Sequence, residues 1–234
     1  MSTGWPAQLL VVRHGESAGN VARDFAESSG LERIALDSRD VAVPRSDRGR
    51  QQATALAPVV ADLDAIWVSP YLRARQTVDA ALDGRAVPVC IDERLREREF
   101  GVLDGLTRKG IIALWPDEAE RRKAVGKFYH RPPGGESWTD AALRVRSVIS
   151  DLRRDHAGER VMVVAHQVVV LLFRYVIESL TEQEILAIDA EGDVANCSIT
   201  TFEDGVLKEY NDVTHLHAQD EPVTAEPDTA HAPR

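Results

Sequence analysis

Short apolar runs recur along the chain, and each ends in a polar or glycine-containing stretch. Runs of this form predict strands that are buried on both faces, as in a mainly parallel sheet. The predicted strands are 8–12, 65–69, 87–91 and 161–165. Two later runs, 198–202 and 206–210, flank an Asp-Gly turn and predict a hairpin.

Helical patterns lie between these runs, and the predicted helices are 46–60, 69–82, 137–152 and 168–177. Ser69 is suited to an N-cap and Pro70 to the first helical position, whereas Pro58 interrupts its helix and costs about 3 kcal/mol unless the helix kinks. The stretch 21–44 is too irregular to assign and is expected to cover the ligand pocket. The alternation predicts an α/β fold with three layers, α/β/α, around a mainly parallel central sheet.

Length and composition indicate one folded domain. The 234 residues contain no linker-like break, and 44% hydrophobic against 28% charged residues can supply a full core. We therefore expect one domain over residues 1–217. Residues 218–234 are rich in Pro, Ala, Asp and Glu, which predicts a disordered tail.

Charge and hydropathy limit the partners. The formal net charge of -10 argues against non-specific nucleic-acid binding, which needs an excess of Lys and Arg. No secretory signal pattern and no run of about 18 apolar residues is present, so we expect a cytoplasmic protein that does not enter membranes. Cys90 and Cys197 lie in apolar, strand-like runs, where we expect buried thiols and no disulfide. The sequence leaves open a homodimer formed through an edge strand.

Two of the predicted strands end on a histidine, His14 after 8–12 and His166 after 161–165. Ligands bind at the carboxyl edge of α/β sheets, so we expect both imidazoles in one pocket. A neutral imidazole carries a lone pair that can attack phosphorus, and Arg13 and Arg73 can hold phosphate oxygens. Either histidine alone would more often be a hydrogen-bonded core residue.

The order of the motifs resembles a known family. Arg13-His14-Gly15-Glu16-Ser17, with Asn20, is similar to the signature block of the histidine phosphatase superfamily, which includes the cofactor-dependent phosphoglycerate mutases. Three later blocks follow in the family's order: Ser69–Thr77 with Arg73, Leu95–Gly101 with Glu97, and Val164–His166. The resemblance covers residues 8–203 and implies the phosphoglycerate mutase-like fold.

The resemblance implies a metal-independent phosphatase that needs no cofactor. His14 would attack phosphorus while Glu97 protonates the leaving oxygen, and Glu97 would then activate water against the phosphohistidine. Arg13, Arg73 and His166 would supply the positive charge. Because Glu97 must be protonated in the first step, its pKa is expected to be raised.

Two assignments within these blocks rest on spacing and analogy. Glu97, rather than Glu99, stands at the spacing from Leu95 that the family's proton donor has. Ser17 and Asn20 are assigned to phosphate binding by analogy. Ser17 could equally cap the helix that follows the signature block and touch no ligand.

The residue after the second histidine is Gln167, where many members of the family have glycine. This pair, with basic residues before a Gly-Glu-Ser segment, resembles the bisphosphatase domain of the enzyme that makes and degrades fructose 2,6-bisphosphate. The resemblance implies that Gln167, Lys127 and Arg131 bind substrate, the two basic residues through a second anionic group. The expected partner is a small phosphorylated metabolite, such as a sugar bisphosphate or a phosphorylated acid. For Lys123, a solvated position is equally expected.

Two alternatives to a phosphatase stay open. A mutase shares the first half-reaction and passes the phosphoryl group to a second hydroxyl, but the mutases' Arg-rich, triple-proline segment is missing here. A non-catalytic protein that binds a phosphorylated ligand is the second, and the intact pair of His14 and His166 argues against it. His215 and His217 lack a third ligand nearby, so we expect no metal there and solvent exposure of both.

Overall fold

The structure is a computed structural model that describes residues 4–225. At its centre lies a six-stranded sheet with the order β3-β2-β4-β1-β5-β6. The first four strands of that order run parallel, while β5 is antiparallel to β1 and β6 to β5. The strands are β1 (Gln8–Arg13), β2 (Ala65–Val68), β3 (Val89–Ile91), β4 (Arg160–Ala165), β5 (Ile199–Glu203) and β6 (Val206–Asp212). The predicted mainly parallel sheet is confirmed.

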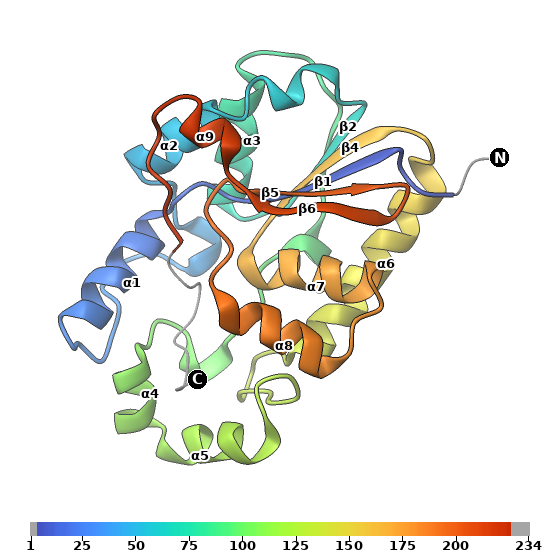
Figure 1. Cartoon of the computed structure of the whole chain (residues 1–234). Helices are drawn as coiled ribbons and strands as arrows, with labels where there is room; N and C mark the ends of the chain where they lie inside the picture. Colours follow the sequence, from blue (N-terminus) through green and yellow to red (C-terminus); the bar gives the residue numbers. More distant parts are fainter. Residues whose placement is uncertain (1–3, 226–234) are drawn as a thin grey trace.

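Helices cover both faces of this sheet (Figure 1). α2 (Asp47–Thr54) and α3 (Leu72–Leu82) pack on one face, whereas α6 (Trp138–Asp155) and α7 (Gln167–Ile177) pack on the other. The remaining helices are α1 (Ala18–Ser28), α4 (Arg108–Leu114), α5 (Pro116–Val125), α8 (Glu182–Glu191) and α9 (Thr214–His217). The three layers expected from the sequence are therefore present.

The central strand β1 shows how the sheet joins two hydrophobic cores. Leu9 and Val11 belong to the core shared with α6 and α7, while Leu10 and Val12 belong to the core shared with α2 and α3. All four side chains are at most 4% exposed. Side chains alternate along a strand, so a sheet covered on both faces requires an apolar residue at every position. Burial of each such side chain stabilises the fold by about 1.5–3 kcal/mol.

The pairing of β1 with β4 brings the two histidines together. The strands are parallel neighbours, and Arg13 stands opposite Ala165 in their register. The next residues, His14 and His166, therefore leave the sheet side by side at its carboxyl edge. The backbone N–H of His14 still donates to the Ala165 carbonyl, at 3.0 Å, which ties the end of one strand to the other.

One predicted helix start is wrong. We expected Ser69 and Pro70 to open a helix, but α3 begins at Leu72, with Tyr71 as its N-cap residue. The Ser69 hydroxyl lies 2.7 Å from the Nε2 atom of His166 and accepts from the Tyr71 N–H at 3.3 Å. The serine is therefore used in the histidine pocket, not as a helix cap.

Two further segments differ from the expectation. α2 begins after the N-cap Ser46 as predicted but ends at Thr54, and Pro58 precedes a separate 3-10 turn, Val59–Asp62. Proline has no N–H to continue a helical hydrogen-bond pattern, which accounts for the break. The unassigned stretch 21–44 starts within α1, because Ser17 caps that helix.

The two cysteines lie in different surroundings. Cys90 was expected to be buried but is exposed, because β3 is the edge strand and pairs only with β2. Cys197 is buried as expected, although it lies just before β5 in a left-handed turn with a φ of 56°. Both thiols are free.

Disorder was predicted from residue 218, and residues 218–225 contradict that boundary. Thr224 is only 8% exposed, and its carbonyl accepts a hydrogen bond of 2.8 Å from the Asn196 N–H. The Pro222 carbonyl accepts one of 2.9 Å from the Gln52 side chain. Composition does not reveal these hydrogen bonds, because the Asn196 N–H and the Gln52 side chain come from distant parts of the chain. Residues 226–234 lie outside the described residues.

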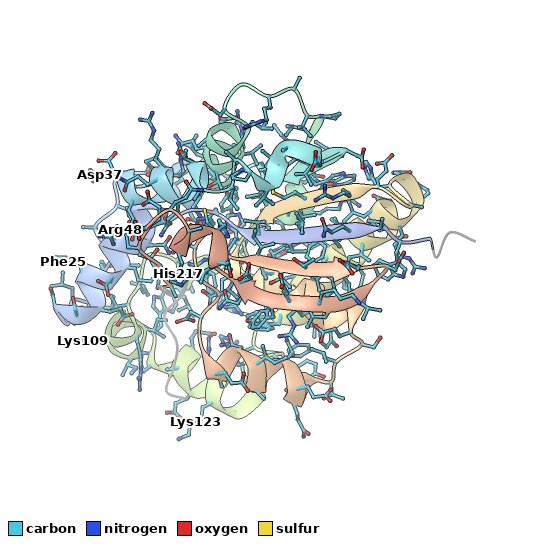
Figure 2. All side chains as sticks on the ribbon, turned by 45° about the horizontal axis from the view of Figure 1, so that its top comes forward. Phe25, Asp37, Arg48, Lys109, Lys123 and His217 are labelled. Carbon is cyan, nitrogen blue, oxygen red and sulfur yellow. The ribbon has the colours of Figure 1, made fainter. Side chains whose placement is uncertain are left out.

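Several side chains project from the surface, and two of the residues considered above, His215 and His217, differ in exposure. Figure 2 shows Phe25, Lys123 and His217 projecting outward. His217 is exposed as predicted, whereas His215 is half-buried, because Leu216 anchors α9 in the core. Within residues 4–225, no helix is long and apolar enough to cross a bilayer.

Candidate active site

His14 follows β1 directly and is fully buried. Its Nδ1 atom lies 2.7 Å from the Gly15 carbonyl oxygen, so Nδ1 carries the proton and donates it. The Nε2 atom then holds the lone pair and accepts a hydrogen bond from the Nε of Arg73, at 3.1 Å. In this tautomer the unprotonated Nε2 atom, whose lone pair is able to attack phosphorus, faces Arg73. The Arg73 guanidinium is a group suited to binding phosphate.

The loop that carries His14 is held backbone to backbone against α2. A Cβ atom on Gly15 would lie 2.4 Å from the Gly49 carbonyl oxygen, and one on Gly49 would lie 2.0 Å from that of Glu16. Both positions therefore require glycine. The Gly15 N–H donates to the Thr77 hydroxyl of α3 at 3.0 Å. The loop that carries His14 is thus tied to two helices.

His166 forms the second wall of the site. It is fully buried, and its ring centroid lies 5.0 Å from that of His14. Its Nε2 atom lies 2.7 Å from the Ser69 hydroxyl at the end of β2, and the Tyr71 ring approaches edge-on with a centroid distance of 5.0 Å. Residues from the ends of β1, β2 and β4 therefore meet in one place.

Arg73 lies in the first turn of α3 and is 4% exposed. Its guanidinium binds the Asp40 carboxylate through two contacts, Nη1 to Oδ1 at 2.8 Å and Nη2 to Oδ2 at 3.2 Å. Nη1 also donates to the Asp40 carbonyl at 2.8 Å. A guanidinium binds carboxylate and phosphate oxygens through the same pair of N–H groups, so the Asp40 carboxylate occupies a position that suits an oxyanion.

Arg13 and His14 are both held by the segment before β5. The buried guanidinium of Arg13 donates to the Val194 carbonyl, and the Arg13 carbonyl accepts from the Cys197 N–H at 3.0 Å. The Asn196 side chain donates to the His14 carbonyl, also at 3.0 Å. This segment closes over the end of β1 and holds the backbone carbonyls of Arg13 and His14.

Glu97 and Glu99 differ in burial, and the assignment of Glu97 as proton donor stays a prediction. Glu97 is 2% exposed, and its Oε1 accepts from the Arg98 N–H at 2.8 Å. Glu99 is exposed and accepts from the Tyr71 hydroxyl at 3.1 Å. Burial, followed by the charge of Glu99, raises the pKa of Tyr71, so this phenol stays a neutral donor. Through Tyr71 the 97–99 segment reaches the His166 side of the site.

Ser17 and Asn20 satisfy one another. Ser17 is the N-cap of α1, where its hydroxyl accepts from the Asn20 N–H at 3.1 Å and the Asn20 side chain accepts from the Ser17 N–H at 3.0 Å. The capping role is therefore present, and contact with phosphate stays a prediction. Gln167 opens α7, is 3% exposed, and donates to the Asp193 carboxylate at 2.7 Å.

The basic residues before the Gly-Glu-Ser segment lie in different places. Lys127 is paired with Asp189 and lies 5.4 Å from the Trp138 ring centroid. Burial lowers the pKa of Lys127, and Asp189 opposes that shift. Arg131 is paired with Asp140, and its side chain is 63% exposed. Lys123 projects into solvent (Figure 2). Only Lys127 of the three lies toward the interior.

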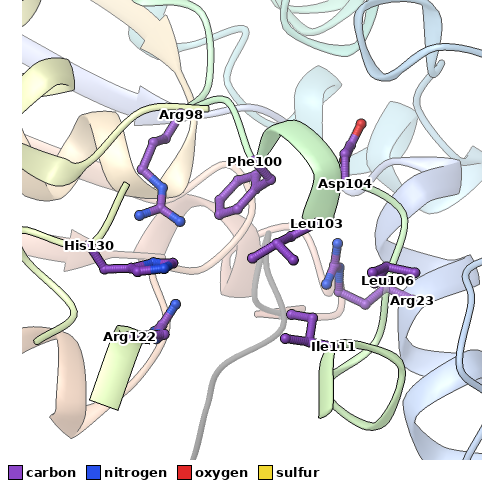
Figure 3. Close-up of a pocket in the computed structure, with 9 residues that line it drawn as sticks. All are labelled: Arg23, Arg98, Phe100, Leu103, Asp104, Leu106, Ile111, Arg122 and His130. Atoms are coloured by element: carbon purple, nitrogen blue, oxygen red, sulfur yellow. The ribbon is translucent and has the colours of Figure 1, made fainter. Parts of the chain in front are cut away.

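Figure 3 shows a basic pocket that the sequence analysis did not identify. Arg23, Arg98, Arg122 and His130 line it, with Asp104 as the acidic residue. Arg98 is 4% exposed, and its Nε and Nη1 atoms have no hydrogen-bond partner among the described residues. Burial, followed by the charge of Arg122, lowers the pKa of Arg98 to about 10. The cavity volume is about 10 Å³, room for about one water molecule, and three arginines against one acidic residue give its lining a net positive charge.

Sequence reasoning missed Asp40, Ser69, Tyr71 and Asn196. Ser69 and Tyr71 lie within the block that contains Arg73, so their position was a usable signal. Asp40 lies in the stretch 21–44 that was expected to cover the pocket, but its pairing with Arg73, like that of Asn196 with His14, depends on tertiary contacts. Over residues 4–225, no group of three or more His, Cys, Asp or Glu side chains is placed to hold a metal ion.

Known proteins match this chain at the level of the family and of single relatives. The family model described as "Histidine phosphatase superfamily (branch 1)" matches residues 9–212. A 2,3-bisphosphoglycerate-dependent phosphoglycerate mutase of Methylobacterium radiotolerans is 33% identical over 76% of this chain and 82% of its own length. The 6-phosphofructo-2-kinase/fructose-2,6-bisphosphatase 3 of Bos taurus is 31% identical over 78% of this chain, which spans only 36% of the bovine protein.

Solved structures show the same fold. YhfR of Bacillus stearothermophilus has a TM-score of 0.72 at 26% identity, covering 89% of this chain and 98% of its own. A mycobacterial glucosyl-3-phosphoglycerate phosphatase has a TM-score of 0.67 at 25% identity, covering 88% and 99% respectively. The expected phosphoglycerate mutase-like architecture is confirmed.

Proposed function

The chain belongs to the histidine phosphatase superfamily (branch 1), and we propose that it hydrolyses a small phosphomonoester through a phosphohistidine intermediate on His14. The observation that carries the proposal is the state of the His14 ring. Its Nδ1–H is bound to a backbone carbonyl, and its Nε2 faces Arg73. A core histidine with a purely structural role would not need its unprotonated nitrogen beside a buried guanidinium and a second buried histidine.

The first half-reaction transfers the phosphoryl group to His14. The Nε2 lone pair forms the N–P bond while the bond from phosphorus to the ester oxygen breaks. Glu97 supplies the proton to the leaving oxygen and becomes a carboxylate. Arg13, Arg73 and His166 stabilise the negative charge on the oxygens around phosphorus. Asp40 has to leave the Arg73 fork before these oxygens can occupy it.

The second half-reaction returns His14 to its starting state. Glu97, now a base, takes a proton from water as the water oxygen attacks phosphorus. The N–P bond breaks, its electron pair returns to Nε2, and inorganic phosphate is released. The first step requires Glu97 in its protonated form, and this residue is buried.

We propose that the substrate carries a second anionic group, as a sugar bisphosphate or a phosphorylated acid does. The names of two relatives, a fructose-2,6-bisphosphatase and a phosphoglycerate mutase, support this class. The pocket around Arg98 and Arg122 supports it electrostatically, because three arginines and one acidic residue, Asp104, line it. Lys127 is a better candidate for the same group than Arg131, which lies at the surface paired with Asp140.

Phosphate release from a panel of phosphorylated metabolites, without added metal, tests the proposal. Wild type should release phosphate and form an acid-labile labelled phosphohistidine, and His14→Ala should do neither. Loss of the nucleophile should lower kcat by at least about 10⁴-fold. Release by the His14→Ala variant at the wild-type rate would refute the assignment.

A mutase is the second candidate, because the mutase relative matches most of this chain. It would isomerise a phosphorylated acid when primed with a bisphosphate and release little phosphate. The same panel separates the two reactions.

Arg98→Leu tests whether the substrate carries a second anionic group: KM should rise about tenfold or more for a doubly anionic substrate and much less for p-nitrophenyl phosphate. Equal effects on both substrates would remove the second-anion proposal.

A further inference from the structure

Thr224 lies beyond the residues that the family model matches, which end at 212. It is nevertheless buried, and its hydroxyl contacts two buried amide side chains. Gln52 Nε2 donates to the Thr224 hydroxyl at 3.0 Å, and this hydroxyl donates to Asn196 Oδ1, also at 3.0 Å. Both amides are 0% exposed, so neither can exchange these partners for water without opening the structure.

Each amide also holds the backbone of the nucleophile loop. Asn196 Nδ2 donates to the His14 carbonyl at 3.0 Å. Gln52 Oε1 accepts from the Glu16 N–H at 3.0 Å. The two contacts fall on either side of Gly15, whose carbonyl accepts the Nδ1 proton of His14. The Thr224 hydroxyl therefore links Asn196 and Gln52, the two side chains that hold the peptide groups on both sides of Gly15.

The hydrogen-bond network requires a side chain at position 224 that both donates and accepts. Because the Glu16 N–H needs an acceptor, Gln52 must turn its NH₂ group toward Thr224. Because the His14 carbonyl needs a donor, Asn196 must turn its oxygen toward the same hydroxyl. The group between them has to accept one hydrogen bond and donate another, which a hydroxyl does and an aliphatic side chain does not.

We infer that Thr224 is a positioning residue for the nucleophile. Through Asn196 and Gln52 it holds the loop in the conformation that points Nε2 of His14 at the phosphoryl site. This inference rests on the proposed function for its effect on turnover, but the coupling of Thr224 to the loop is a property of the fold. Without the hydroxyl, the buried amide groups of Gln52 and Asn196 each lose a partner, and their hold on the peptide groups on both sides of Gly15 weakens.

Thr224→Val removes the hydroxyl at nearly constant volume, and Thr224→Ser keeps it. The valine variant should lower kcat about tenfold while KM stays within about twofold. The orientation of the His14 ring changes, whereas the groups that bind the substrate stay in place. The serine variant should restore kcat to within about twofold of wild type. Val223→Ala, on the same segment but 39% exposed, is the matched control and should resemble wild type.

Hydrogen exchange of the peptide that contains residues 14–20 gives a readout that does not depend on turnover. Its exchange should be about tenfold faster in Thr224→Val and restored in Thr224→Ser. Thr224→Ala removes the same hydroxyl and is measured in parallel, so that a folding defect in one variant leaves the test intact. Unchanged kcat and exchange in the hydroxyl-free variants, or equal loss in Val223→Ala, would overturn the inference. An inactive wild type would defeat the proposed function, and the exchange data would still decide whether Thr224 holds the loop.

Discussion

Replacing Asp40 with asparagine tests whether this carboxylate competes with substrate for the Arg73 guanidinium. Asp40 fills both arms of the fork, with contacts of 2.8 and 3.2 Å, and a phosphoryl group has to displace it. Asparagine removes the negative charge and keeps a side chain of nearly the same shape. The variant should therefore bind phosphate more tightly than wild type does.

The magnitude follows from the exposure of the pair. Arg73 is nearly buried, but the Asp40 side chain is 41% exposed, so water screens the attraction. An ion pair of this kind contributes about 1 kcal/mol, which corresponds to about a fivefold change in affinity. The backbone carbonyl of Asp40 also accepts from Arg73 and is unaffected by the substitution. About fivefold is therefore the expected decrease in both KM and the inhibition constant of inorganic phosphate.

The assay is steady-state hydrolysis with inorganic phosphate as competitive inhibitor. Asp37→Asn is the matched control, because Asp37 is exposed on the same segment and the substitution removes the same charge (Figure 2). Asp40→Asn should lower the inhibition constant and Asp37→Asn should not. If Asp40→Asn raises KM, or if both variants change the inhibition constant equally, Asp40 is not an internal competitor and the reasoning fails.

Two other outcomes follow from single contacts. Ser69→Ala removes the hydroxyl beside Nε2 of His166 and should lower kcat about tenfold with little change in melting temperature; unchanged kcat would show that this contact does not orient the ring. Burial lowers the pKa of His130, so the unfolded chain takes up the proton more readily and stability falls as the pH drops below about 6.5. The melting temperature of His130→Gln should therefore fall less than that of wild type between pH 7 and pH 5, and parallel curves would contradict this.

Much of the fold could be predicted from local pattern. A strand covered on both faces needs a continuous apolar run, so 9–12 and 161–165 were identifiable without any tertiary information. The position of His14 and His166 at the ends of these strands then followed from the geometry of parallel sheets. The helices 137–152 and 168–177 were found for the same reason, since their apolar patterns depend on neighbours in the sequence.

Local pattern is not enough where a side chain has two possible partners. Ser69 has the local pattern of an N-cap, but its hydroxyl contacts His166 from another strand. Arg131 and Lys127 share a basic segment, yet one pairs with Asp140 at the surface and the other with Asp189 in the interior. Pairings of this kind depend on where distant elements lie, and spacing along the chain carries no information about them.

The sequence by itself determined the layered α/β fold, the order of the motifs and the two histidines, because periodicity and strand ends are local properties. Only the tertiary structure decided that Asp40 pairs with the Arg73 guanidinium. It also decided that Thr224 links the Asn196 and Gln52 side chains, which hold the loop around His14. The segment around Thr224 has the composition of a disordered tail, since it holds little apolar surface. It is ordered because Gln52 and Asn196, far away in the chain, satisfy its polar groups in the interior. Such hydrogen bonds form only after the sheet has brought their partners together.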